Sequence, residues 1–401
     1  MRDRYAAVVA GGGPAGLQTA RELAAAGHDV AVLEADDALG DNDKSTGGTF
    51  GQVVDGYGLP DRVVMDDVST IAFEGPSERG TLSLSAYVLD FPELQEWLGT
   101  AVERAGGTVH TGTRVQSPVV EDGVVRGVEV TRGGERRTVR ADLTVDATGP
   151  AAALAGPLGM FDRGGAQRGI GMEFEVEGPY ETGDELLFAF DHDRAPGGYA
   201  WTFPAGEKRY KAGVCWVDEF AEARGRERPI RDYVESWLAA DGRWGGGEVR
   251  AIHAGEGVWT DSITVRARDG VLAVGDAASS INPLFGEGIR PAMASASMAA
   301  AAAAPALDAG DLSRERLRAY EERWNREYGG KWRLQRLLSD LLYDFTPSQQ
   351  DRFVRAVERL GDGGAARLGR YDLSVRDLLT LYPFDPRDLG KLPGLLRGLR
   401  S

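Results

Sequence analysis

An α/β fold with two domains and a helical C-terminal region is predicted by three observations along this chain. A glycine-rich turn joins an apolar strand to a helix near the start, and a second strand-to-glycine segment follows much later. Between them the sequence alternates apolar and polar residues and is rich in aromatic side chains. The glycine segments are typical of one Rossmann-type nucleotide-binding domain, and the alternation is typical of an inserted antiparallel sheet. We therefore expect a discontinuous nucleotide-binding domain over 1–164 and 266–312, a mostly antiparallel β-sheet substrate domain over 165–265, and a helical region over 313–401.

The composition limits the classes of partner. Of the 401 residues, 62 are acidic and 46 are basic, which gives a net charge of −16, and only five of the bases are lysine. Such a charge repels phosphate backbones, so we expect no nucleic-acid partner. An acid-rich, lysine-poor surface is typical of proteins that stay hydrated in a high-salt cytoplasm. GC-rich codon usage is the alternative explanation.

Targeting and cysteine patterns indicate a cytoplasmic location. The first apolar stretch is interrupted by glycines and is not followed by a cleavage site, so we expect no secretory signal. The longest apolar run, 293–307, is mostly alanine and too short to cross a bilayer. Cys215 is the single cysteine, which excludes an internal disulfide and a CxxC redox or zinc site.

The first glycine segment is a dinucleotide-binding fingerprint. Residues 5–34 are predicted to form a strand, a turn, a helix and a second strand. Gly11 permits the tight turn, Gly13 lets the backbone approach a pyrophosphate, and Gly16 allows close packing of the helix on the strand. The helix N-terminus favours the negative charge of the phosphates. Glu34 ends the second strand, where a carboxylate accepts hydrogen bonds from ribose, so this segment is predicted to bind FAD or NAD.

The second glycine segment favours FAD. Gly275 and Asp276 close a strand and place a carboxylate where the ribityl chain would pass. Gly286, Gly288 and Ile289 then open a helix, whose N-terminus would stabilise negative charge on a reduced flavin. We therefore predict that one FAD is bound at both ends by these two segments.

The remaining elements follow from periodicity and turn residues. Residues 40–58 are rich in glycine and polar side chains and are expected to form a loop. A helix is predicted over 91–105 and a series of strands over 109–145. In the central region, a helix is predicted near 230–238 among aromatic-rich strands.

An aromatic strand is the third notable signal. Tyr199, Trp201 and Phe203 alternate, so they point to one face of a strand. Such a face suits an apolar substrate beside a flavin, and an ordinary core strand is the alternative.

Taken together, the chain resembles the geranylgeranyl reductase family of flavoproteins, within the p-hydroxybenzoate-hydroxylase-like FAD fold, and is most similar to its haloarchaeal branch. The resemblance covers roughly residues 1–345. The segments that carry it are GGGPAG (11–16), Glu34, KSTGGT (44–49), DATGP (146–150), PGGYAWTFP (196–204) and GDAASSINPLFGEGI (275–289). The aromatic pattern is the most specific of these and resembles the family's lipid-pocket strand. The resemblance thus implies substrate contacts at Tyr199, Trp201 and Phe203.

The resemblance also implies a set of cofactor contacts, which lie in both glycine segments and in two stretches between them. They are Ala15, Glu34, Ser45, Thr46, Gly47, Val115, Asp276, Gly288 and Ile289.

The chain departs from the family pattern at two places. Many members have a cysteine in the loop that is formed here by residues 45–48, so any role of that thiol is absent. Phe91 stands where members often have an arginine, which removes a polar contact to the cofactor.

The activity implied by the resemblance is saturation of isoprenoid double bonds in archaeal-type ether lipids or a related polyprenyl lipid. We expect hydride from N5 of reduced FAD and a proton at the other carbon. No side chain is identified as the proton donor. His192 is the histidine nearest the aromatic strand, and we expect it to lie in a solvated loop.

Three other functions fit the same motifs. They are an FAD-dependent monooxygenase or hydroxylase, a non-redox flavin-dependent carotenoid cyclase, and a non-catalytic flavin-binding subunit. Coupled oxygen consumption would indicate the first, and lycopene isomerisation without electron consumption the second. Bound FAD that no substrate reduces or reoxidises would indicate the third.

Electrons must come from outside the chain, because no second glycine fingerprint follows a strand. Ferredoxin, NAD(P)H or a deazaflavin are the candidate donors. The basic, leucine-bearing residues 391–400 are expected either to cap the substrate domain or to rest on a membrane surface.

Overall fold

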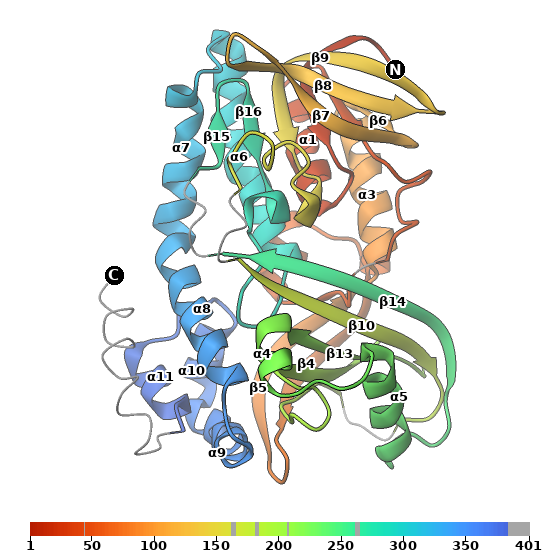
Figure 1. Ribbon diagram of the computed structural model, residues 1–401, viewed down its shortest axis with the longest axis vertical. Coiled ribbons are helices and arrows are strands. Elements are labelled where there is room, and N and C mark those ends of the chain that lie inside the picture. Colours follow the sequence, from red (N-terminus) through yellow and green to blue (C-terminus); the bar gives the residue numbers. More distant parts are fainter. Residues whose placement is uncertain (44, 162–165, 181–183, 207, 261–264, 384–401) are drawn as a thin grey trace. The chain divides into compact units, whose positions relative to one another are not determined.

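The computed structural model describes residues 1–43, 45–161, 166–180, 184–206, 208–260 and 265–383, and the chain forms two compact units (Figure 1). The first unit contains Met1–Asp43, Phe91–Ala166 and Gly257–Gly330, and the second contains Lys44–Asp90, Gln167–Glu256 and Lys331–Ser401. These bounds differ from the domains expected from the sequence. Three strands before residue 90 belong to the same sheet as the central strands, and helices near the C-terminus pack on two of these three.

The first unit is built on a sheet whose central strands are short, apolar and parallel. β1 (Arg4–Ala10) pairs in parallel with β2 (Val30–Leu33) and with β9 (Glu135–Asp146). β6 (Thr108–His110) extends the sheet beyond β2, and β16 (Val271–Ala273) extends it beyond β9. All four residues of β2 are buried, because both faces of a parallel sheet are covered. This topology confirms the Rossmann-type prediction.

The remaining strands of this sheet pair antiparallel. β7 (Thr113–Glu121) pairs with β8 (Val124–Arg132), and β8 pairs with the first half of β9. β15 (Ala267–Arg268) pairs with β16.

Helices pack around this sheet and position its glycine segments. α1 (Pro14–Ala25) packs against α3 (Phe91–Arg104) and α6 (Ile289–Ala309), and α6 packs against α7 (Arg314–Trp324). Half of the buried positions of α6 are alanine, which allows close approach of α1. The helix continues through Pro305.

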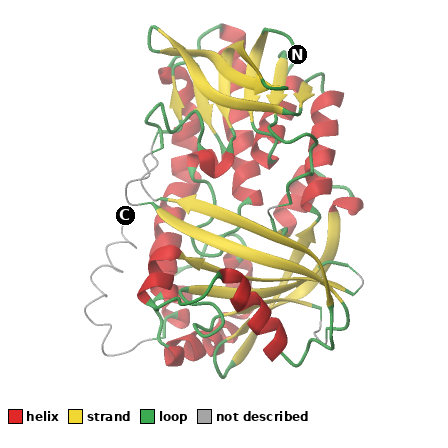
Figure 2. Ribbon diagram, turned by 45° about the vertical axis from the view of Figure 1, so that its right-hand side comes forward, coloured by secondary structure: helices red, strands yellow, loops and turns green. Residues whose placement is uncertain are grey.

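The second unit is built on an eight-stranded sheet, whose strands are yellow in Figure 2. In spatial order they are β14 (Glu248–Trp259), β10 (Gln167–Glu177), β13 (Arg209–Val217), β12 (Gly198–Pro204), β11 (Glu185–Ala189), β4 (Val64–Glu74), β5 (Arg79–Leu89) and β3 (Gly48–Thr49). β10, β13, β12 and β11 pair antiparallel in turn, and β11 pairs in parallel with β4. The predicted antiparallel character is therefore confirmed.

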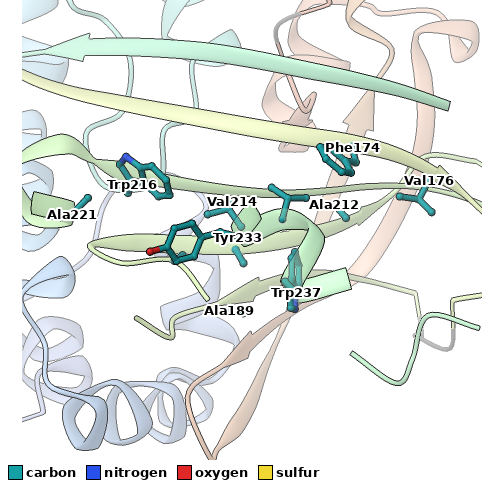
Figure 3. Close-up of a cluster of buried hydrophobic side chains, with 12 residues drawn as sticks. Phe174, Val176, Ala189, Ala212, Val214, Trp216, Ala221, Tyr233 and Trp237 are labelled. Atoms are coloured by element: carbon teal, nitrogen blue, oxygen red, sulfur yellow. The ribbon is translucent and has the colours of Figure 1, made fainter. Parts of the chain in front are cut away.

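One face of the second sheet carries a hydrophobic core under α5 (Ile230–Ala240). Figure 3 shows Tyr233 and Trp237 of this helix beside Ala212 and Val214 of β13. Trp216 and α4 (Asp218–Ala223) lie at one end of the same cluster. This core faces away from the side chains at Tyr199, Trp201 and Phe203, because successive side chains of a strand point to opposite faces.

Residues 40–58 are not entirely loop, which corrects the expectation for that stretch. α2 (Gly51–Tyr57) forms there and ends at Gly58, which adopts a left-handed conformation with φ +64°. Val53 is fully buried, and this packing compensates for the glycines that weaken the helix.

The C-terminal region is helical where it is described. Its elements are a π-helical turn (Asn325–Gly329), α8 (Gly330–Tyr343), α9 (Pro347–Val357), α10 (Gly361–Leu368) and α11 (Val375–Leu381). α9 begins with a capping box between Thr346 and Gln349, and it packs on β5 together with α10. Across the described residues, no helix is long and apolar enough to span a membrane. The basic segment 391–400 lies outside the described residues.

Candidate cofactor-binding and substrate-binding residues

The first glycine turn leaves an open, unblocked helix N-terminus. Gly11 has φ +107°, and a Cβ there would lie 2.3 Å from the carbonyl oxygen of Ala147. A Cβ on Gly16 would lie 2.1 Å from the carbonyl oxygen of Gly11, so both positions require glycine. Gly13 caps α1, and no described atom lies within 4 Å of the place where its Cβ would be. The N-terminus of α1 therefore faces open space, as a phosphate site requires.

Glu34 reaches back to this turn from the end of β2. Its Oε2 accepts a hydrogen bond from the Gly12 amide at 2.5 Å, and its Oε1 accepts from the Asp36 amide at 2.9 Å. Gln95 of α3 donates from Nε2 to the Gly12 carbonyl at 3.1 Å. Gln95 is buried, and sequence patterns gave no indication of this contact. Glu34 and Gln95 together fix both polar groups of Gly12.

Gly275 brings the second glycine segment against the first. It follows β16 with φ +57°, and a Cβ on it would lie 2.8 Å from Cβ of Ala15. Its amide donates to Oγ of Ser295, in α6, at 2.8 Å. The structure thus unites Gly11, Ala15 and Gly275 in one place.

Asp276 carries a buried carboxylate with spare hydrogen-bonding capacity. Within the described part of the chain, its Oδ1 has no hydrogen-bond partner. Burial raises the pKa of Asp276 to about 6, and the backbone amide of Ile281 opposes this rise. A buried acceptor without a donor is unfavourable by about 1–3 kcal/mol, which a ligand hydroxyl would relieve.

The loop that leads into α6 is organised by Asn282, which is fully buried. Its Oδ1 accepts from the amides of Leu284 at 2.8 Å and Phe285 at 3.0 Å. Its backbone amide donates to the Glu287 carbonyl at 2.9 Å, and its carbonyl accepts from the Gly286 amide at 3.0 Å. Asn282 was not predicted as a site residue from the sequence, although an Asn-Pro pair is a recognised turn signal.

The N-terminus of α6 is also open. Gly286 has φ +68°, and Gly288 caps the helix that begins at Ile289. No described atom lies within 4 Å of the place where a Cβ of Gly288 would be. Arg290 is paired with Glu287 at 2.8 Å, so its charge is balanced beside the helix end.

Val115 lies on β7, which is tied to the end of β2. The Thr113 amide donates to the Glu34 carbonyl at 2.7 Å, two residues before Val115. The side chain of Val115 is half-buried and packs on the core of the first sheet.

These features of the first unit fit an FAD. Two helix N-termini without side-chain caps would hold phosphate and the flavin pyrimidine edge, and both have a glycine where a side chain would obstruct the ligand. Asp276 would accept from a ribityl hydroxyl. Glu34 would accept a hydrogen bond from a ribose hydroxyl, in place of one of its two amide hydrogen bonds or in addition to them.

In the second unit, hydrogen bonds hold the loop formed by Ser45, Thr46 and Gly47. Oγ of Ser45 accepts from the Gly47 amide at 3.2 Å, and the Gly47 carbonyl accepts from the Leu89 amide at 3.0 Å. Gly47 has φ +82°, and a Cβ on it would lie 2.1 Å from the Leu89 carbonyl oxygen. The loop conformation therefore requires glycine at position 47.

The predicted aromatic strand is β12, and its three aromatic side chains form a buried wall. Tyr199, Trp201 and Phe203 are each less than 10% exposed. Phe188 of β11 joins them, with its ring centroid 5.6 Å from that of Tyr199 and 5.1 Å from that of Phe203. The Phe203 ring packs on Gly48, where a Cβ would lie 2.7 Å from the ring. We refer to these four aromatic residues as the aromatic wall.

Burial keeps the polar groups of this wall protonated. It raises the pKa of Tyr199 well above the usual range and raises the pKa of Cys215, the facing residue of β13, to about 12. Neither the Tyr199 hydroxyl nor the Cys215 thiol is ionised at neutral pH, so the wall is uncharged at these two residues.

His192 is a structural residue that links two parts of the second unit. Its Nε2 lies 2.8 Å from the Phe345 carbonyl, to which it donates, and its Nδ1 accepts from the Gly197 amide at 3.3 Å. Burial lowers the pKa of His192, which agrees with a neutral ring. The ring is half-buried in these contacts, and the expectation of a solvated loop histidine was wrong.

Comparisons with known proteins agree with this geometry. A family model described as an FAD binding domain matches residues 4–327. A digeranylgeranylglycerophospholipid reductase of Haloferax volcanii is 34% identical, over 90% of this chain and 91% of that protein. A digeranylgeranylglycerophospholipid reductase 1 of Methanopyrus kandleri is 28% identical, over 88% and 94%.

A solved structure shares the fold. It is a geranylgeranyl bacteriochlorophyll reductase-like protein from Thermoplasma acidophilum, with a TM-score of 0.85, 20% identity and 99% of each chain covered. At this identity the likeness is evidence for the fold alone.

Proposed function

This chain belongs to the digeranylgeranylglycerophospholipid reductase family, and from that premise we propose that it saturates isoprenoid double bonds of archaeal-type ether lipids or a related polyprenyl lipid. It is an FAD-dependent oxidoreductase that acts on CH–CH bonds. The observation that carries the substrate class is the aromatic wall, a buried apolar surface in the unit that does not hold the glycine segments.

The reaction adds a hydride to one alkene carbon and a proton to the other. FAD, when bound and reduced, supplies the hydride equivalent. An isolated prenyl alkene has no carbonyl that an acid could polarise, so orientation and exclusion of water are what the protein contributes. Tyr199, Trp201 and Phe203 would bind and orient the prenyl chain, and their burial keeps water from it.

The residues proposed to hold the cofactor come from several separate segments of the sequence. Gly11, Gly13 and Gly16 would present the N-terminus of α1 to the pyrophosphate, and Glu34 would accept from ribose. The other contacts in this proposal are Ala15, Ser45, Thr46, Gly47, Val115, Gly275, Asp276, Gly286, Gly288 and Ile289.

A mass-spectrometric assay tests the function. Dithionite-reduced protein with full FAD is incubated in high salt with a digeranylgeranylglycerol phospholipid, and the product gains the mass of two hydrogens per reduced bond. The matched control is the fully saturated lipid, which should neither change in mass nor reoxidise the flavin. An unchanged mass of the unsaturated lipid under these conditions would contradict the proposal.

The wall itself is tested by Trp201→Leu, which removes the largest ring and keeps the position apolar. Loss of packing against a prenyl chain should raise KM by about tenfold or more. Val249→Leu on β14, an exposed position of the same sheet, is the control and should leave KM unchanged.

The electron donor docks transiently in this proposal. Among the described residues, Gly245–Gly247 leads from α5 toward β14, and Gly361 opens α10, so neither segment follows a strand as a dinucleotide fingerprint does. Ferredoxin, NAD(P)H and reduced deazaflavin are the candidates. Anaerobic stopped-flow absorbance of the bound flavin, with each donor alone, distinguishes them by the rate of bleaching.

The lipid substrate also suggests peripheral membrane contact of an otherwise cytoplasmic protein. Val375 and Leu379 of α11 lie one helical turn apart and are 52% and 57% exposed. Arg376 lies between them on the same helix. Exposed apolar side chains beside a basic residue fit the surface of a lipid bilayer.

A further inference from the structure

The face of the second sheet that carries the aromatic wall also carries a buried ion pair. In the register of β10, β13 and β12, Glu173 stands opposite Gly213, and Gly213 stands opposite Trp201. Lys211 stands opposite Phe203, two pairs further along. Because side chains two apart on a strand share a face, Glu173, Lys211 and the aromatic wall lie on the same side of the sheet.

Glu173 fixes the indole of Trp201. The Trp201 ring lies across Gly213, where a Cβ would lie only 2.2 Å from the ring carbon Cζ2. Across that glycine, Nε1 of Trp201 donates to Oε2 of Glu173 at 2.9 Å. Both residues are buried. The Glu173 carboxylate therefore fixes the orientation of the indole ring through this hydrogen bond, and the absence of a side chain at Gly213 leaves room for the ring.

Lys211 connects this carboxylate to the loop at residues 45–47. Its side chain is 1% exposed, and Nζ lies 3.9 Å from Oε1 of Glu173 and 3.9 Å from Oε1 of Glu175. Nζ also donates to the Ser45 carbonyl at 3.3 Å. An ammonium thus lies between the loop and Glu173, the acceptor of the Trp201 indole.

Such a pair is unfavourable as a device for stability alone. Removing two charges from water costs several kcal/mol per ion, and apolar residues of similar volume often serve as well or better. The hydrophobic core of this sheet is on the opposite face, under α5. A role in orienting neighbouring groups would explain why Glu173 and Lys211 are buried together.

We propose that Glu173 and Lys211 are positioning residues for prenyl reduction, Glu173 by orienting Trp201 of the lipid-binding wall and Lys211 by holding the Ser45 carbonyl of the cofactor loop. Through these contacts, one ion pair sets the geometry of both loop and wall. The inference rests on the proposed function for its substrate, and on the contacts above for its residues.

The main test is the double variant Glu173→Leu/Lys211→Met, which replaces both charges with apolar side chains of similar length. Glu175, the other carboxylate beside Lys211, is partly exposed and keeps Nε2 of His253 3.1 Å from its Oε1. Removal of Glu173 and Lys211 together therefore leaves no fully buried unpaired charge, and the variant should fold, bind FAD and unfold near the wild-type temperature. Its kcat/KM for the prenyl lipid should fall by about tenfold or more, because a hydrogen bond to a charged acceptor is lost. A folded double variant with wild-type kcat/KM would overturn the proposal.

Glu173→Gln is the conservative rescue. It retains an oxygen that accepts from Trp201, so kcat/KM should stay within about threefold of wild type, a difference below the strength of one hydrogen bond. Glu177→Gln is the matched control, with the same change on the same strand at an exposed position that pairs with Arg250. It should change nothing.

A readout that needs no turnover separates this inference from the proposed function. The indole N–H resonance of Trp201, assigned through Trp201→Phe, should move in the double variant and stay near its wild-type position in Glu173→Gln. If the wild type reduces no prenyl lipid, the function fails and this resonance still reports the positioning of Trp201. An unmoved resonance in the double variant would contradict the role of Glu173, whatever the activity.

Discussion

Gly275 and Ala15 approach so closely that a Cβ on Gly275 would lie 2.8 Å from Cβ of Ala15. The turn after β16 and the first turn of α1 thus meet at one point, although one belongs to the last strand of the first sheet and the other follows its first strand. The close approach leaves no room for a side chain at position 275. Position 275 also favours glycine because its φ is +57°.

Gly275→Ala should therefore weaken both the fold and FAD binding. The new methyl group overpacks the contact with Ala15, and the free energy of unfolding of the apo-protein should fall by about 1–3 kcal/mol. Urea unfolding and flavin content measure the two effects. Gly288→Ala is the matched comparison, because its φ of −104° tolerates a side chain and its Cβ would enter open space. It should leave apo stability unchanged and weaken FAD binding by about tenfold or more, and unchanged FAD affinity would contradict the cofactor position proposed at α6.

Asp276→Asn should stabilise the apo-protein in a pH-dependent way. Burial raises the pKa of Asp276 from 3.8 to about 6. The unfolded chain releases this proton at lower pH than the folded apo-protein does, so the free energy of unfolding falls as pH rises from about 4 to about 6. Asparagine removes this loss, and the apo-variant should exceed apo-wild type by up to about 3 kcal/mol above pH 6, with no difference below pH 4.

The holo-protein should respond to Asp276→Asn in the opposite sense. The proposed carboxylate acceptor for a ribityl hydroxyl is lost, so FAD affinity should fall by about tenfold. Denaturation curves at several pH values and a flavin titration test both statements. A variant that binds FAD as tightly as wild type would contradict the role assigned to Asp276.

His192→Gln should change stability and leave catalysis alone. Burial lowers the pKa of His192, while the Phe345 carbonyl opposes this. Below the ordinary pKa of 6.5 the unfolded chain binds the proton more readily, so the folded protein loses stability as pH falls. Glutamine should reduce this slope between about pH 5 and 6.5. The pH profile of kcat should keep its shape, and a profile that loses its acidic limb would identify His192 as a proton donor.

Val375→Ser together with Leu379→Ser should reduce membrane association. Burying two such side chains in a bilayer interface contributes roughly 1.5–3 kcal/mol each, so flotation with prenyl ether phospholipid vesicles should show at least about a tenfold loss of binding. Val120→Ser, on β7 of the other unit, removes an exposed valine and should have no effect. Equal binding of all three proteins would contradict the membrane contact.

The predictable parts of this molecule are those with a local signal. The turn at Gly11–Gly16, the strand before Gly275 and the aromatic strand each have a period or a fingerprint that identifies the element, and the structure has all three. Strands β4 and β5 have weaker alternation, with Asp66 and Asp67 adjacent in β4, and they were not predicted. β4 pairs with β11 and β5 pairs with β4, which moves the domain bounds.

Residues that act through tertiary contacts had no such signal. Gln95 is one polar residue on an amphipathic helix, and its hydrogen bond to Gly12 depends on where α3 packs. Lys211 and Glu173 look like solvated residues of alternating strands, since their partners are on neighbouring strands or in a distant loop. Their burial depends on the register of β10, β13 and β12, which local patterns do not determine.

In the second sheet, even-numbered and odd-numbered residues of three strands lie on opposite faces, so substitutions at the two sets have different effects. On β10, β12 and β13, even-numbered positions such as Phe174, Ala200 and Val214 form the core under α5. Odd-numbered positions such as Trp201 and Lys211 face the other way. A combinatorial library confined to Tyr199, Trp201 and Phe203 would therefore vary the proposed lipid-binding face while every core residue under α5 keeps its side chain.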